Sequence, residues 1–143
     1  ALDVPFVSQD DVLFNDTALA MHVPYDSESS PIACHTIATA QNAGWIWDIG
    51  LTHRRGVGHV YSSDYLSDDE AEGNLRQYLG EAGKDVSTRK ISFKSGHRKQ
   101  FWKNNCVAVG MSAGFVEPLE ATAIMLVEIS ARFIAENLPA ENT

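Results

Sequence analysis

A turn of small residues gives the sequence its clearest chemical pattern. Residues 110–114 (Gly-Met-Ser-Ala-Gly) follow the apolar run 106–109, as in the Gly-x-Ser-x-Gly elbow of α/β-hydrolases. That fold needs an acid and a histidine after the serine, yet no Asp or His follows Ser112, and Pro118 predicts a helix starting six residues later. We therefore disfavour a hydrolase. Two interpretations stay open: tight packing of strand on helix, or helix N–H groups directed at an anion or a polar cofactor edge.

Glu120 is the second candidate, because it is a carboxylate among apolar residues where that helix is expected to begin. An acid in the first turn is stabilised by the helix dipole, so a capping role explains it. A general base, with a pKa set by partial burial, is the functional alternative. The residue types alone favour the capping role.

Trp45 and Trp47 form the third candidate, since they alternate with Ile46 and Asp48 at the period of a β-strand. Such tryptophans pack a core or a hairpin, or they wall an aromatic or flavin pocket, and spacing leaves both interpretations open. The five histidines show no zinc-helix spacing, and no Cys-x-x-Cys is present. We therefore expect no metal site.

These residues need elements that position them. We expect strands at residues 12–23, 32–40, 90–94 and 106–109, and a hairpin at 44–65. Ser67 and Glu70 form the pattern of a capping box and predict a helix that ends at Gly80. A second helix is expected at 118–138; it is mostly apolar and so predicted to be largely buried. Cys106 is predicted to be a small buried hydrophobic residue.

Composition indicates an ordinary globular chain. Of its 143 residues, 44% are hydrophobic and 21% charged, which excludes disorder over the whole chain. The 11 basic and 19 acidic residues give a net charge of -8, which disfavours nucleic acid and anionic membranes as partners. No apolar stretch reaches the ~18 residues of a membrane span, and two cysteines make no disulfide framework, so we expect a cytoplasmic protein.

Several segments together resemble one enzyme family. Residues 44–49 (Gly-Trp-Ile-Trp-Asp-Ile) resemble the Trp-x-Trp-x-Ile-Pro motif of flavin-dependent tryptophan halogenases. Residues 105–122 (Asn-Cys-Val-Ala-Val-Gly-Met-Ser-Ala-Gly-Phe-Val-Glu-Pro-Leu-Glu-Ala-Thr) are similar to the second signature of that family. Residues 13–16, 55–63 and 90–93 also resemble family segments, in the right order. The resemblance covers about residues 12–135.

The resemblance implies a larger enzyme with an α+β fold, in which an antiparallel or mixed sheet with packed helices forms part of a flavin monooxygenase-like FAD-binding fold. In that family, reduced FAD and oxygen give a flavin hydroperoxide, which turns chloride or bromide into hypohalous acid that halogenates tryptophan or another indole. The implied partners are a small aromatic substrate and a separate flavin reductase, with a homodimer as one option for assembly.

Residues 1–143 would then be a central fragment. The family's Gly-x-Gly-x-x-Gly motif and catalytic lysine are absent from this sequence and are expected upstream, and the helical part that completes substrate binding is expected downstream. We expect the fragment to bind FAD poorly and to be inactive alone. The absence of an initiator methionine agrees with this expectation.

The resemblance also assigns roles residue by residue. Glu120 matches the glutamate beside the substrate, which orients the electrophile or takes the proton from the halogenated ring. The backbone N–H groups of Thr122 and Ala123 match the halide site. The cofactor is expected beside six residues: Trp45, Trp47, Ile49, Gly110, Gly114 and Pro118.

Two residues depart from the family pattern. Gly50 stands where the motif has proline, and Ala121 stands where tryptophan halogenases commonly have serine. The first departure motivates an alternative, a flavin-dependent hydroxylase of the same fold. The second removes a hydroxyl near the substrate. A non-catalytic binding domain is the third hypothesis, motivated by the missing dinucleotide motif.

Overall fold

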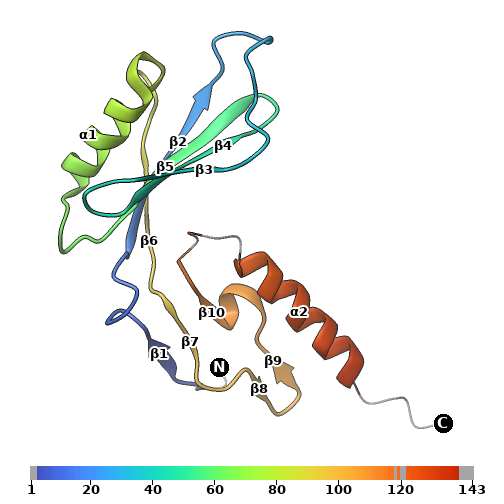
Figure 1. Ribbon diagram of the computed structural model, residues 1–143. Coiled ribbons are helices and arrows are strands. Elements are labelled where there is room, and N and C mark those ends of the chain that lie inside the picture. Colours follow the sequence, from blue (N-terminus) through green and yellow to red (C-terminus); the bar gives the residue numbers. More distant parts are fainter. Residues whose placement is uncertain (1–2, 118, 120–121, 139–143) are drawn as a thin grey trace. The chain divides into compact units, whose positions relative to one another are not determined.

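The computed structural model describes residues 3–117, 119 and 122–138, and the chain divides into two compact units. We call Phe14–Phe93 the sheet unit, and Ala1–Leu13 together with Lys94–Thr143 the turn unit. Figure 1 shows one helix in each: α1 (Asp68–Leu79) in the sheet unit and α2 (Thr122–Asn137) in the turn unit. The strands among the described residues pair antiparallel, and the helices are separate from these paired strands. This arrangement confirms the predicted α+β class.

Five antiparallel strands in the order β3-β4-β5-β2-β6 form the sheet unit's main layer. They are β2 (Thr17–Pro24), β3 (Ile37–Ala40), β4 (Trp45–Gly50), β5 (Arg54–Tyr61) and β6 (Arg89–Ser92). The predicted hairpin is confirmed, with Trp45 opposite Val60 and Gly50 opposite Arg55. The strands predicted at 12–23 and 32–40 begin five residues late, at Thr17 and Ile37, because the segments before them are irregular.

Helix α1 begins as the sequence predicts. The Ser67 hydroxyl accepts a hydrogen bond from the Glu70 backbone N–H at 3.3 Å, and the Glu70 carboxylate accepts one from the Ser67 backbone N–H at 3.0 Å. The Ser67 hydroxyl also donates to the Glu70 carboxylate at 2.6 Å, and this bond, followed by the one from the Ser67 N–H, holds the pKa of Glu70 below its usual range. Gly80 ends the helix with a φ of 59°, a conformation that favours glycine, and begins the 3-10 turn η1 (Gly80–Gly83).

Helix α1 covers one face of the sheet. A buried cluster on this helix-covered face joins three strands to the helix: Leu19, Met21, Val23, Ile46, Val57, Tyr61, Ala71, Leu75 and Leu79. Since neighbouring residues of a strand point to opposite faces, Trp45 and Trp47 lie on the other side, which we call the tryptophan face. There they pack in a smaller cluster with Ala18, Val60 and Phe93.

The turn unit consists of short elements. A three-stranded sheet has the order β1-β7-β10, and a separate ribbon pairs β8 with β9. The strands are β1 (Phe6–Ser8), β7 (Gly96–Arg98), β8 (Trp102–Lys103), β9 (Cys106–Val107) and β10 (Gly114–Phe115). The small-residue turn forms the 3-10 turn η2 (Gly110–Ser112), which contacts α2.

Two burial predictions for the turn unit are wrong. None of the described residues of α2 is buried, and Ile124 is 75% exposed. Cys106 is exposed as well, because β9 has two residues and pairs with β8 alone. Apolar side chains become buried only where a neighbour covers them, and the described residues provide little cover for these two elements.

Among the described residues, no helix has the length and apolar character that crossing a membrane requires.

Candidate functional site

The tryptophan face holds three of the predicted cofactor-binding residues. Trp45 is buried and Trp47 half-buried, and their rings meet edge to face with centroids 6.2 Å apart and planes at 61°. Ile49 is the next residue on the same face and is 39% exposed. The strand therefore presents two packed indoles followed by an accessible apolar side chain.

Trp47 lies directly on the backbone of β5. Gly58 stands opposite it, and a Cβ added at Gly58 would lie 2.1 Å from Cζ2 and 2.2 Å from Cη2 of the indole. Gly56 stands on the same face opposite Ile49, and a Cβ there would meet no atom within 4 Å. The indole of Trp47 thus occupies the space that any larger residue at position 58 would need.

Asp48 forms a buried polar cluster on the helix-covered face. Arg55 donates from Nε to Oδ1 at 3.1 Å and forms an ion pair with Oδ2 through Nη2. Tyr78 of α1 donates its hydroxyl to Oδ2 at 3.2 Å. The hydrogen bond to Asp48 raises the pKa of Arg55, while burial and the charge of Asp48 raise the pKa of Tyr78. The cluster therefore joins β4 to β5 and α1.

This cluster was missed at the level of sequence, although a signal for it exists. Strand alternation places Asp48 on the same face as Ile46, which is buried, and a carboxylate on a core face requires donors. The hairpin turn then brings back Arg55, whose guanidinium reaches Asp48 from the neighbouring strand.

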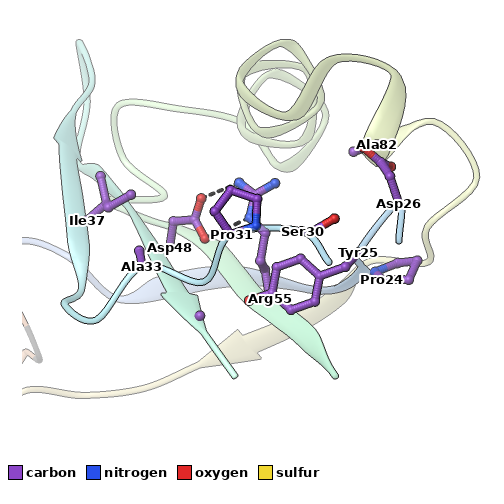
Figure 2. Close-up of a pocket in the computed structure, with 11 residues that line it drawn as sticks. Pro24, Tyr25, Asp26, Ser30, Pro31, Ala33, Ile37, Asp48, Arg55 and Ala82 are labelled. Atoms are coloured by element: carbon purple, nitrogen blue, oxygen red, sulfur yellow. Dashed lines mark hydrogen bonds and ion pairs between the residues drawn. The ribbon is translucent and has the colours of Figure 1, made fainter. Parts of the chain in front are cut away.

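A cavity of about 300 Å³ adjoins the cluster. Figure 2 shows Asp48 and Arg55 joined within it, with side chains of the loop at residues 24–33 around them. Gly50 also lines it, and a Cβ at Gly50 would lie 2.9 Å from the Ala33 carbonyl oxygen. The close approach of this loop therefore gives glycine a structural reason at the position where the motif has proline.

Further polar ties join α1 to the sheet. The Tyr61 hydroxyl donates to Asp68 Oδ1 at 2.6 Å, and Lys90 Nζ donates to Asp68 Oδ2 at 2.5 Å. The bond to Lys90 is the main cause that lowers the pKa of Asp68, and burial is the main cause that raises the pKa of Tyr61. His59 is fully buried, with each ring nitrogen 3.2 Å from a backbone carbonyl oxygen, those of Ala71 and Ala43.

Among the described residues, no group of three or more His, Cys, Asp and Glu side chains is placed to hold a metal ion.

The small-residue turn holds its serine in a local role. Ser112 Oγ donates to the Val109 carbonyl oxygen at 2.8 Å and accepts from the Val109 N–H at 3.0 Å, which agrees with the argument against a nucleophile. Gly110 has a φ of 61°, and a Cβ there would meet only Val127 Cγ2, at 3.5 Å. Gly114 is required by strand packing, because its Cβ would lie 2.5 Å from the Gly96 carbonyl oxygen.

The predicted halide-binding residues begin α2. Thr122 is half-buried and Ala123 exposed, and the first N–H groups of a helix have no partner within it. Pro118 and Glu120 lie outside the described residues. The turn unit therefore positions Gly110, Gly114, Thr122 and Ala123, while the sheet unit positions Trp45, Trp47 and Ile49.

Comparison with known proteins gives one consistent family. The family model for tryptophan halogenase matches residues 1–143. The 7-chloro-L-tryptophan 6-halogenase KtzR of Kutzneria sp. (strain 744) is 48% identical over 140 residues, which are 98% of this chain and 27% of that protein. Tryptophan 6-halogenase SttH of Streptomyces toxytricini is 49% identical with the same coverage.

Solved structures agree with these relatives. A crystal structure of a tryptophan halogenase from Shewanella frigidimarina NCIMB 400 matches 96% of this chain with a TM-score of 0.90 and 52% identity, over 27% of its own length. The chain thus spans about a quarter of the length of the relatives it matches.

Proposed function

Because the chain belongs to the tryptophan halogenase family, we propose that it forms the central part of a flavin-dependent enzyme that halogenates tryptophan or a related indole. The observation that carries this proposal is the match to the family over residues 1–143, with relatives at 48–49% identity that are named as 6-halogenases of 7-chloro-L-tryptophan and of tryptophan. The edge-to-face tryptophan pair on one sheet face supports it.

The residues present are compatible with a flavin. Gly110 leaves open space beside its left-handed backbone, so the flat edge of a ligand can approach the turn closely. We propose that Gly110, Gly114 and Pro118 hold the cofactor at the turn, and that Trp45, Trp47 and Ile49 face it or the substrate. When bound, reduced FAD would supply the oxygen activation that oxidises chloride or bromide.

The chain's own groups have three proposed tasks. The N–H groups of Thr122 and Ala123 hold the halide, because free N–H groups and the helix dipole at a helix start favour an anion. Glu120 orients the electrophile, or accepts the proton that leaves the ring carbon when the carbon–halogen bond forms. The tryptophan pair excludes water and bulky groups and so favours halogenation over hydroxylation.

The proposed substrate and partner follow from the family. The name of SttH gives tryptophan as its substrate and that of KtzR gives 7-chloro-L-tryptophan, and we extend this class of substrate, tryptophan or a related indole, to this chain. A separate flavin reductase would deliver reduced FAD.

Product analysis tests the proposal. The protein that contains this sequence is incubated with FAD, a flavin reductase, tryptophan and bromide or chloride, and the products are weighed by mass spectrometry. A halogen adduct is expected. An oxygen adduct would instead establish a hydroxylase, and unchanged tryptophan together with absent flavin binding would establish a non-catalytic domain.

A further inference from the structure

Position 58 on the tryptophan face holds a glycine that its backbone does not demand. Gly58 is buried in the middle of β5, and it is not among the glycines with positive φ. A glycine in a strand interior weakens the strand, since it packs no side chain and loses more chain entropy on folding. Its presence therefore calls for a close approach by another group.

That group is the indole of Trp47. Two atoms of its six-membered ring, Cζ2 and Cη2, lie 2.1 and 2.2 Å from where a Cβ of Gly58 would stand. The Leu19 carbonyl oxygen of β2 is the third close atom, at 2.6 Å. The ring therefore lies closer to the sheet than a larger residue at position 58 would allow, and in this position it meets Trp45 edge to face.

We infer that Gly58 is the positioning residue of Trp47: it fixes how deeply the indole lies on the sheet and how it meets Trp45. This inference rests on the proposed function for its consequence in catalysis. If the tryptophan pair lines the space around the reacting groups, a Cβ at position 58 pushes the indole of Trp47 toward them. A displacement of about 1 Å near reacting groups can cost as much as ~100-fold in rate.

Gly56 supplies the matched control. It lies two residues away on the same strand and face, opposite Ile49, and a Cβ there meets nothing within 4 Å. The variants Gly58→Ala and Gly56→Ala thus change the same atom and the same chain entropy, and only one of them disturbs the indole.

Spectroscopy on the purified protein that contains this sequence tests positioning without reference to catalysis. Trp45 and Trp47 are close enough to give the paired far-ultraviolet circular dichroism bands of coupled indoles, and every other tryptophan, Trp102 included, adds a background that is the same in each variant. Gly58→Ala should remove most of this couplet and make Trp47 more accessible to acrylamide quenching, whereas Gly56→Ala should change neither. A Gly58→Ala spectrum identical to that of the native chain overturns the inference.

A compensating variant covers the case in which Gly58→Ala fails to fold. Trp47→Leu shortens the side chain above position 58 and leaves the close Leu19 carbonyl oxygen in place, so Gly58→Ala should lower the melting temperature much less in the Trp47→Leu background than in the native one. If Gly58→Ala destabilises both backgrounds equally, glycine is needed at position 58 only because the Leu19 carbonyl oxygen of β2 is close, and the inference is wrong.

Product analysis then tests the catalytic consequence. In the protein that contains this sequence, Gly58→Ala should lower the rate of tryptophan halogenation roughly tenfold or more relative to Gly56→Ala, with a rise in oxygenated product or unproductive oxidation. An altered couplet with unchanged halogenation would refute the catalytic consequence. If even the native protein forms no halotryptophan, the proposed function fails, while the spectroscopic result still decides whether Gly58 positions Trp47.

Discussion

Replacing Arg55 with methionine removes the main donor to the buried carboxylate of Asp48. Asp48 is 4% exposed and accepts hydrogen bonds from Arg55 and Tyr78. Methionine keeps an apolar stem but donates no hydrogen bond, so the buried carboxylate would keep the Tyr78 hydroxyl in place of both donors. Breaking a buried ion pair costs about 3–5 kcal/mol. Because the Arg55 side chain is 29% exposed, solvent screening reduces the expected loss in the free energy of unfolding to about 2–3 kcal/mol.

Urea denaturation followed by circular dichroism measures this loss from the midpoint and slope of the transition. Arg54→Met is the matched control, because the neighbouring arginine points to the opposite face of β5, and we expect a change within about 0.5 kcal/mol. Asp48→Asn combined with Arg55→Met should be less destabilising than the sum of the single variants by about 1 kcal/mol or more, since a neutral amide is easier to bury.

Two results would refute the reasoning. Arg55→Met could lower the free energy of unfolding by less than about 0.5 kcal/mol, the size of an ordinary surface substitution. The second refuting result is that the effects of Asp48→Asn and Arg55→Met on the free energy of unfolding are strictly additive. Either result would show that water or another donor already satisfies Asp48 in the folded chain.

Three further outcomes are expected. Ser67→Ala should cost about 1 kcal/mol of stability in urea denaturation, whereas Ser67→Asp, which keeps a capping oxygen, should cost less. Lys90 holds the pKa of Asp68 below its ordinary value of 3.8, so this carboxylate stabilises the fold above that pH, and the contribution disappears as the pH falls through the lower folded-state pKa. As the pH is lowered, the melting temperature should therefore fall less for Asp68→Asn than for the native chain. Glu120→Gln should reduce tryptophan halogenation by about 10²–10⁴-fold in product assays and leave flavin binding intact.

Local signals in the sequence were enough for the hairpin and for α1. The period of two through Trp45 and Trp47 predicted a strand with both indoles on one face, and the paired strand confirms it. Ser67 and Glu70 predicted the start of α1 because a capping box is contained within four residues. Such features depend on neighbours in the chain and need no knowledge of distant segments.

Long-range features were harder to predict. The ion pair of Asp48 with Arg55 depends on the hairpin register, and the contact with Tyr78 depends on where α1 packs. The contact of Trp47 with Gly58 likewise depends on the register between β4 and β5. Burial of Cys106 was predicted from its apolar neighbours in sequence and is wrong, because a two-residue strand in a two-stranded ribbon has little to cover it. The predicted roles of the site residues, Glu120 among them, stay predictions.

The exposed apolar residues of α2 predict how residues 1–143 behave in solution when they are prepared alone. Large side chains such as Ile124, Ile129 and Phe133 are more than half exposed, and an apolar surface of this kind attracts further copies as concentration rises. The net charge of -8 opposes that attraction, but salt at about 0.1 M confines the repulsion to roughly 10 Å. Solubility should therefore be highest at low ionic strength and neutral pH, and should decline as salt is added or as the pH approaches the isoelectric point near 4.9.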